Sequence, residues 1–245
     1  HEAIDKKILV LHYQPQIKSK DGINSIIGLE ALIRWKDSQK GMISPAEFIP
    51  LAEETGLIIP LGTWILEEVI KKIKNWENHD IKKDWRISVN ISYKQFEKDD
   101  FLEKLEYLLQ KYQINPSRLR LELTEGLLIK NTQTILKKIK DINNLGVTLS
   151  IDDFGTGYSS LSYLKHLSIS ELKIDQSFVR DILSDPNDAI IVETMISIGN
   201  KFNLEVIAEG VETQEQYEKL LLLGCCYFQG YLFGKPNLEN LICMG

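Results

Sequence analysis

The sequence predicts an α/β protein, most simply a (β/α)8 barrel of the TIM type. Its 245 residues suffice for one large core, and about eight apolar segments alternate with segments of helical periodicity. Polar residues recur where the apolar segments end, which is where barrel enzymes place their active sites. Two small domains would also fit this length. The amino-acid composition does not distinguish between a single barrel and two small domains.

The predicted strands are apolar, β-branched segments bounded by turn residues or helix caps. They cover residues 8–17, 25–35, 85–92, 118–124, 146–151, 171–175, 204–210 and 225–231. Pro15 interrupts the first strand, and proline is tolerated at a sheet edge or a strand end. In the second strand, alternation places Glu30, Leu32 and Arg34 on one face.

The predicted helices lie between these strands. They cover residues 44–55, 63–78, 101–112, 131–144, 161–167, 188–202 and 214–223. The first has a Ser44 cap, Pro45 in its first turn, Glu47 as the capping-box acid and Gly56 as its stop. The alternation of strands with helices favours a parallel barrel.

Composition excludes several classes of protein. A net charge of −6 argues against a face that binds long nucleic acids, so any nucleotide ligand should be small. Cys225 and Cys226 are neighbours without metal-ligand spacing, which predicts small core residues in a reducing compartment. No apolar segment approaches the roughly 20 residues of a membrane span. We expect a cytoplasmic domain without membrane contact.

Acidic residues mark the end of the strand at 146–151. Asp152 and Asp153 are adjacent carboxylates, which are costly to desolvate unless a cation lies beside them. Gly155 and Gly157 allow a sharp turn directly afterwards. A surface turn would explain this pair alone, but other strand ends carry functional side chains too. Those residues are Glu30, Asn90, Glu122, Lys173, Glu209 and Gln229.

Together these side chains predict a metal-dependent site. The oxygen-rich shell, suited to Mg²⁺ or Mn²⁺ rather than zinc, would consist of Glu30, Asn90, Glu122, Asp152 and Glu209. Asp153 could hold a second cation, as in two-metal phosphate chemistry. Lys173 could act as a base with a lowered pKa, and Arg34 could neutralise a phosphate. An enolase-type lyase uses similar parts, so the residues alone leave both reaction classes open.

Several motifs resemble the signatures of the EAL-domain cyclic di-GMP phosphodiesterases. The first are Tyr13-Gln14-Pro15 and Glu30-Ala31-Leu32, the latter followed by Arg34-Trp35. The other motifs lie at residues 89–92, 122–125, 152–157, 172–175, 208–212 and 229–231. They occur in family order over nearly the whole chain.

The resemblance implies a barrel whose first strand runs antiparallel to the others. It implies hydrolysis of one bond of cyclic di-GMP to give linear pGpG, with Mg²⁺ or Mn²⁺ as cofactor and two ions per site. It also implies a single domain over residues 1–245, cut from a longer signalling protein with sensory or GGDEF-type domains. That parent protein could be membrane-anchored.

The resemblance further implies roles for individual residues. The first metal would be bound by Glu30, Asn90, Glu122, Asp152 and Glu209, and the second by Asp152 and Asp153. Lys173 would hold or deprotonate the attacking water, with Glu212 and Gln229 orienting the water network. The substrate contacts would be Gln14, Leu32, Arg34 and Gln229. Glu125 would brace the loop after Asp153, which the family links to dimer formation, so we expect a homodimer.

Many proteins of this type have lost such residues and only bind the dinucleotide. A catalytically silent receptor is therefore the alternative to an enzyme. This chain retains the residues of the motifs, which favours the enzyme.

Overall fold

The computed structural model describes residues 8–37, 39–129, 133–157, 164 and 167–238. In this part of the chain, eight strands close into a barrel in the order β1-β9-β8-β7-β6-β5-β4-β2, and β1 pairs with β2 to complete the ring. The barrel strands are β1 (Leu9–Lys20), β2 (Ile23–Asp37), β4 (Arg86–Asn90), β5 (Leu119–Thr124), β6 (Thr148–Phe154), β7 (Glu171–Ile174), β8 (Glu205–Ala208) and β9 (Tyr227–Gln229). The predicted fold class is confirmed.

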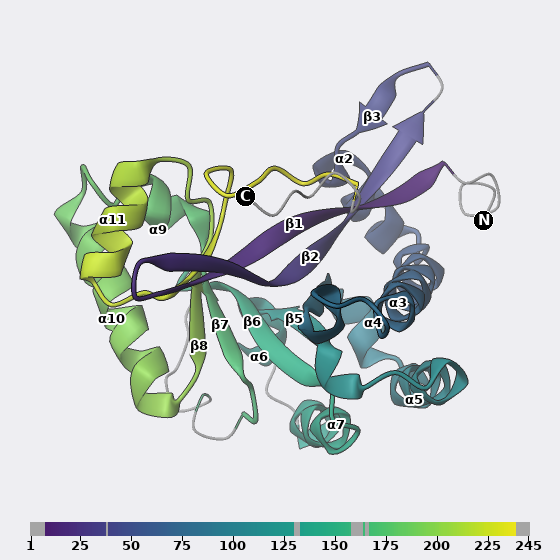
Figure 1. The fold of residues 1–245 in the computed structure, drawn as a ribbon. Coiled ribbons are helices and arrows are strands. Elements are labelled where there is room, and N and C mark those ends of the chain that lie inside the picture. Colours follow the sequence, from purple (N-terminus) through teal and green to yellow (C-terminus); the bar gives the residue numbers. More distant parts are fainter. Residues whose placement is uncertain (1–7, 38, 130–132, 158–163, 165–166, 239–245) are drawn as a thin grey trace.

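The first strand differs from the others in direction. β1 pairs antiparallel with both β2 and β9, whereas β2, β4, β5, β6, β7, β8 and β9 follow one another in parallel. The barrel is therefore mixed, as the family resemblance implied. The short β3 (Gly41–Ile43) forms a hairpin with the end of β2 that projects beyond the barrel (Figure 1).

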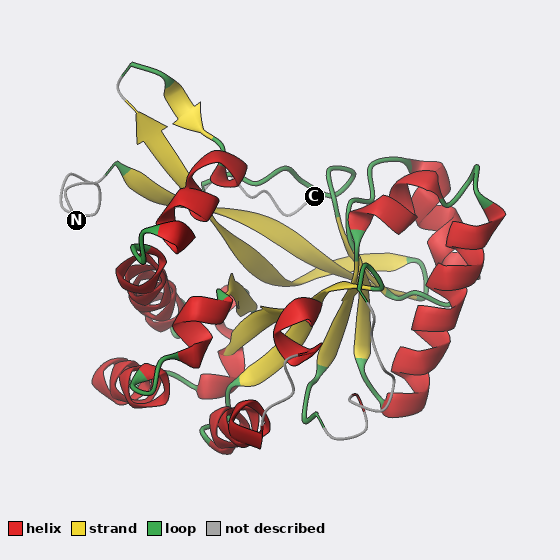
Figure 2. Ribbon diagram, turned by 180° about the vertical axis from the view of Figure 1, so that it is seen from behind, coloured by secondary structure: helices red, strands yellow, loops and turns green. Residues whose placement is uncertain are grey.

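Helices surround the outside of the barrel (Figure 2). They are α2 (Pro45–Glu54), α3 (Ile58–Asn75), α4 (Tyr93–Glu97), α5 (Phe101–Tyr112), α6 (Glu125–Ile129), α7 (Gln133–Asn144), α9 (Gln176–Asp181), α10 (Pro186–Phe202) and α11 (Gln214–Leu222). Short 3-10 turns lie at Lys82–Asp84 and Pro116–Arg118. Most of the helix predicted over 161–167 lies outside the described residues.

Apolar side chains between helices and barrel form the core. On α3, Val69, Ile70 and Ile73 are fully buried, and Ile87 of β4 is buried with them. Each such side chain contributes about 1.5–3 kcal/mol through burial. The spacing of the α3 residues is the helical stripe that the sequence displays.

Pro15 lies inside β1 rather than at its end, at a position where β1 pairs with β2 but not with β9, as at a sheet edge. β1 runs through Pro15, which lies opposite Leu29 of β2, and the first residue that pairs with β9 is Gln16. The missing N–H of proline therefore costs no ladder hydrogen bond to β9 at this position. A register irregularity follows between Gln16 and Ile17.

The prediction that Cys225 and Cys226 are core residues is confirmed for Cys225 and wrong for Cys226. Cys225 is buried, and burial raises the pKa of its thiol to about 12. Cys226, which precedes β9, is exposed. Cys243 lies outside the described residues. Among the described helices, none combines the length and apolar character needed to cross a bilayer.

Candidate active site

Lys173 of β7 lies among four carboxylates at the C-terminal ends of the strands. Its ammonium nitrogen is 2.7 Å from Glu122 Oε2 and 2.7 Å from Glu209 Oε1. It is 3.2 Å from Asp152 Oδ1 and 3.5 Å from Glu30 Oε2. Only 1% of the lysine side chain is exposed. Barrel closure thus brings together one cation and four anions that are distant in sequence.

The carboxylates control the protonation of this lysine. Burial opposes the charge of Lys173, but Asp152, Glu122, Glu209 and Glu30 together raise its pKa well above the usual value of a lysine. The expected lowering of the Lys173 pKa concerns a site that holds cations beside the lysine, and it stays a prediction. Desolvation raises the pKa of Glu122 and of Glu209 well above the usual value of a glutamate.

Glu30 is held by amide side chains from two other strands. Asn90 Nδ2 donates to Glu30 Oε1 at 2.7 Å, and Gln229 Nε2 donates to Glu30 Oε2. Gln229 Nε2 also donates to Gln14 Oε1 at 3.2 Å. Burial disfavours the charge of Glu30, but Lys173, Gln229 and Asn90 outweigh burial and lower its pKa. Four residues predicted from separate motifs therefore form one hydrogen-bonded group.

Asp153 lies at the rim of this group, next to Asp152. One oxygen each from Asp152, Asp153 and Glu209 lies within 4.8 Å of the others. Both aspartates belong to β6, which the sequence predicted to end before them, since β6 continues to Phe154. Asp153 has a left-handed backbone with φ of 55°, a strained conformation that is common at functional sites. Desolvation and the charge of Asp152 raise the pKa of Asp153 to about 6.

Two polar residues adjoin the site that the sequence reading did not assign to it. The charge of Asp175 helps to raise the pKa of Asp153, and Asp175 Oδ1 accepts from the Ser177 backbone N–H at 3.0 Å. Gln16 Nε2 donates to Gln229 Oε1 at 3.1 Å. Gln16 lies two positions after Gln14 on β1, so strand alternation could have placed it on the same face. Asp175 follows the end of β7 and is the N-cap of α9.

The donor atoms fit a hard divalent cation. The side chains of the group offer carboxylate and amide oxygens, which Mg²⁺ and Mn²⁺ prefer, and no thiolate or imidazole. Glu122 Oε1 is buried without a hydrogen-bond partner in the described part of the chain. A buried carboxylate oxygen of this kind is costly unless something binds it. The acidic group can therefore hold a metal ion.

Glu125 lies behind the loop that follows Asp153. Its side chain is buried, and Oε2 accepts from the backbone N–H groups of Gly155 at 3.0 Å and Gly157 at 3.2 Å. A Cβ added at Gly157 would lie 2.9 Å from Glu125 Oε1, so glycine permits this close approach. The carboxylate thereby ties the start of this loop to the end of β5.

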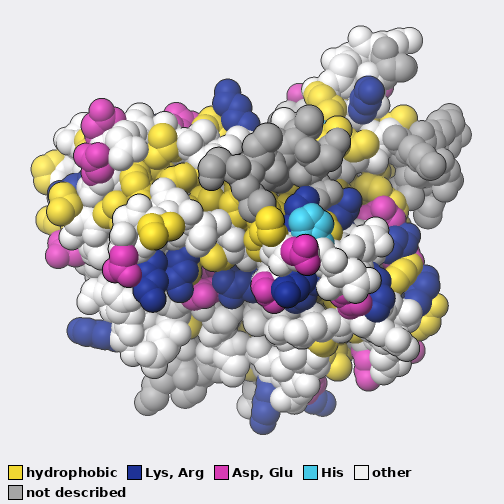
Figure 3. Space-filling view, viewed as in Figure 1, with side chains coloured by type: hydrophobic (Ala, Val, Ile, Leu, Met, Phe, Trp, Pro, Cys, Tyr) yellow, Lys and Arg dark blue, Asp and Glu magenta, His cyan; other side chains and the backbone are white. Residues whose placement is uncertain are grey.

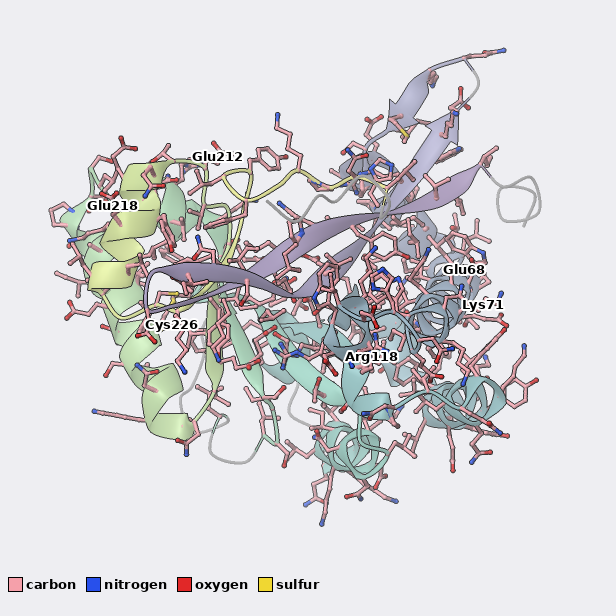
Figure 4. All side chains as sticks on the ribbon, in the orientation of Figure 1. Glu68, Lys71, Arg118, Glu212, Glu218 and Cys226 are labelled. Atoms are coloured by element: carbon pink, nitrogen blue, oxygen red, sulfur yellow. The ribbon has the colours of Figure 1, made fainter. Side chains whose placement is uncertain are left out.

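The structure shows no contact of the remaining predicted residues with Lys173 among the described residues. Leu32 and Arg34 follow Glu30 on β2 and are half-buried, and Arg34 Nη1 donates to the Ile33 carbonyl at 2.8 Å. Desolvation lowers the pKa of Arg34. Glu212 lies on the loop between β8 and α11 and is exposed (Figure 4). Within the described part of the chain its carboxylate makes no hydrogen bond, so the structure does not join it to the group.

The face of the molecule shown in Figure 3 has mixed charge. Basic and acidic side chains alternate across the face shown in Figure 3 rather than forming a basic patch.

The sequence is similar to those of known proteins over most of its length. The chain is 43% identical over 235 residues to the bifunctional diguanylate cyclase/cyclic di-GMP phosphodiesterase MucR of Pseudomonas aeruginosa, covering 96% of this chain and 34% of MucR. It is 40% identical over 235 residues to the cyclic di-GMP phosphodiesterase PdeR of Escherichia coli, covering 96% of this chain and 35% of PdeR. The chain thus spans about a third of the length of these curated relatives.

The fold is also similar to solved structures. The structure of the PaMucR phosphodiesterase in complex with c-di-GMP matches with a TM-score of 0.94 at 42% identity, covering 99% of this chain and 97% of the other. A sequence model of the EAL domain matches residues 1–236. Because this match includes the strands, the acidic group and Lys173, the chain belongs to the EAL domain family.

Proposed function

We propose that this chain is a metal-dependent phosphodiesterase that hydrolyses one bond of cyclic di-GMP to give linear pGpG. The observation that carries this proposal is the buried Lys173 among Glu30, Glu122, Asp152 and Glu209 at the mouth of an EAL barrel. MucR and PdeR are named as cyclic di-GMP phosphodiesterases, and the similar PaMucR structure contains c-di-GMP. These relatives support the same substrate here.

Mg²⁺ or Mn²⁺ is the proposed cofactor, with two ions per site. The first ion would be held by Glu30, Asn90, Glu122, Asp152 and Glu209, and the second by Asp152 and Asp153. When bound, such ions polarise phosphoryl oxygens and acidify water. The all-oxygen donor set and the unpartnered Glu122 oxygen in the described part of the chain support this assignment.

The side chains of the protein have separate tasks in this proposal. Lys173 Nζ would hold or deprotonate the attacking water. Asn90 and Gln229 orient the Glu30 carboxylate through their amide hydrogen bonds, and Gln229 would also orient water and substrate. Glu212 would join this water network from its exposed loop. The substrate contacts would come from Gln14, Leu32 and Arg34, with the Arg34 guanidinium facing a phosphate.

We further propose that residues 1–245 form one catalytic domain of a longer cytoplasmic signalling protein that also contains sensory or GGDEF-type domains. The chain matches a third of MucR, which is named as bifunctional, and this supports a multidomain parent. A homodimer is the proposed active form. The Glu125 contacts to Gly155 and Gly157 would fix the loop involved in dimer formation.

The test is turnover by the purified chain. We expect linear pGpG from cyclic di-GMP with Mg²⁺ or Mn²⁺, separated by chromatography, and none with EDTA. Lys173→Ala and Glu30→Ala should each lose activity, whereas Lys104→Ala, which changes an exposed lysine on α5, should retain it. Full activity of Lys173→Ala would exclude its assigned role. Tight binding without product would identify the chain as a receptor instead.

A further inference from the structure

A pocket lies at the end of the barrel opposite to Lys173, where the parallel strands begin. Its lining includes Arg86, the first residue of β4, and Arg118, which directly precedes β5. Its volume of about 700 Å³ lies within the roughly 300–1,000 Å³ of small-molecule sites. The proposed reaction takes place at the other end of the barrel, so this pocket has no task in it.

Arg118, which is labelled in Figure 4, brings a buried positive charge to this pocket. Only 6% of the residue is exposed. Its Nε donates to the Trp85 carbonyl at 3.1 Å, and its Nη1 and Nη2 donate to the carbonyls of Ile73 and Lys82 at 3.4 and 2.7 Å. Each Nη atom of a guanidinium carries two N–H donors, so within the described part of the chain one N–H of each has no partner.

The charge of Arg118 also lacks a direct counter-ion. Among the described residues, no carboxylate forms an ion pair with Arg118, in contrast to Arg86, which pairs with Glu205 at 2.9 Å. Burial lowers the pKa of Arg118, and the charges of Glu77 and Asp84 offset only part of this effect. A buried charge without a counter-ion is costly, so an anion that enters the pocket would be stabilised there.

Lys83 adds a second cation to the lining. Its side chain is exposed and forms no ion pair or hydrogen bond with the described residues. Asp84 also lines the pocket, and its exposed carboxylate can accept hydrogen bonds from hydroxyl groups. Ile26 and Ile81 supply apolar surface. The pocket therefore combines two cations that have no ion-pair partner in the described part of the chain with a hydrogen-bond acceptor and apolar contacts.

We propose that this pocket binds a small phosphate ester of the nucleoside monophosphate type. The phosphate would lie between Arg118 and Lys83, because guanidinium and ammonium groups donate charge-assisted hydrogen bonds to phosphate oxygens. The sugar hydroxyl groups would donate to Asp84, and the base would contact Ile26 and Ile81. This site shares none of these residues with the proposed active site, so its occupancy does not depend on the proposed reaction.

The experiment titrates the whole chain by calorimetry with AMP, adenosine and inorganic phosphate, in EDTA to keep divalent cations off the metal site. The test variants are Lys83→Glu and Arg118→Met. We expect the wild type to bind AMP about tenfold or more tightly than adenosine, because only AMP offers a phosphate to the two cations. Each test variant should weaken AMP binding about tenfold or more.

Two controls show where AMP binds. Lys201→Glu changes an exposed lysine on α10, and Arg34→Ala removes a proposed substrate contact of the active site. Both controls should bind AMP like the wild type. Thermal melts establish that every variant is folded. Arg118→Met loses three hydrogen bonds to the backbone, so Lys83→Glu, at an exposed position, decides the test if that variant does not fold.

Several results would overturn this proposal. They are a wild type that does not bind AMP, equal affinities for AMP and adenosine, and an unchanged Kd for AMP in folded Lys83→Glu. Loss of AMP binding in Arg34→Ala would place the ligand in the active site instead. Inorganic phosphate that binds as tightly as AMP would overturn the assignment of the nucleoside part. The titration measures no turnover, so its failure leaves the proposed hydrolysis of cyclic di-GMP unaffected.

Discussion

The charge state of Lys173 depends on carboxylates that come from several strands distant in sequence. Its ammonium group contacts Glu122, Glu209, Asp152 and Glu30, and its pKa is raised by them although burial alone would lower it. Removing one partner from a buried ion cluster leaves charge that nothing compensates. The lysine therefore stabilises the carboxylates at the barrel mouth, in addition to its role in the proposed chemistry.

Lys173→Met should therefore destabilise the chain in EDTA by about 3–5 kcal/mol, because it leaves buried carboxylates facing one another. Added Mg²⁺ should raise the thermal midpoint of the variant more than that of the wild type, since a cation then offsets the repulsion. Thermal melts with EDTA and with Mg²⁺ measure both effects.

A matched control for this prediction is Lys104→Met. Lys104 is 2.7 Å from Asp100 on the surface, with 47% of its side chain exposed. Such a pair is worth less than about 1 kcal/mol. Equal destabilisation of the two variants, or equal Mg²⁺ shifts in variant and wild type, would contradict the role of Lys173 as the counter-ion of the cluster.

At the scale of elements, alternation along the strands places a second ionic group at the opposite end of the barrel. Arg120 lies two residues before Glu122 on β5 and pairs with Glu171, and its Nη2 is 2.9 Å from Glu205 Oε2. Arg86 Nη1 is also 2.9 Å from Glu205 Oε2. Burial would raise the pKa of Glu205, but Arg120 and Arg86 outweigh it and lower this pKa.

The lowered pKa of Glu205 predicts how its contribution to stability depends on pH. The unfolded chain binds a proton near the ordinary value of 4.5, whereas the folded chain binds it only at lower pH. The ion pairs therefore stabilise the fold above pH 4.5, and this stabilisation is lost as the pH falls through the folded pKa. Glu205→Gln should be less stable than the wild type at pH 7, and the difference should shrink below pH 4.5.

Urea unfolding at several pH values measures this difference. Glu218→Gln on α11 is the control, because Glu218 is exposed and bonds only to Gln214 among the described residues, so it should stay close to the wild type. A gap between Glu205→Gln and the wild type that stays constant or widens on acidification would refute the prediction.

At the scale of the whole molecule, the two ends of the chain close the barrel together. β1 pairs with β9, and Tyr13 exchanges backbone hydrogen bonds of 2.7 and 3.0 Å with Asn237. Gln229 of β9 also reaches Glu30 in the active site. The strand β9 therefore both closes the barrel and supplies a residue of the candidate site.

A chain that ends at Gly224 should lose cooperative unfolding, because removal of β9 leaves open edges on β1 and β8. A chain that ends at Leu238 retains β9 and the Tyr13 contact and should unfold like the full chain. Circular dichroism during thermal unfolding measures both. A sharp transition in the shorter chain would show that closure is dispensable.

The sequence by itself determined the alternation of strands and helices and the strand ends on which the polar residues lie. Periodicity and caps are local, so α5 was predicted with its observed bounds and α2 to within one residue. The three- to six-residue elements β3, α4, α6 and α9 were missed, because they are too short to show a period. α3 begins five residues before its predicted start, since Pro60 fits within its first turn.

Only the tertiary structure decided which polar residues meet and in which charge state. The sequence placed Lys173 near carboxylates, but the contact distances that raise its pKa depend on barrel closure. Burial and long-range pairing are properties of the packed chain, and they govern desolvation, hydrogen bonding and therefore the chemistry of the site.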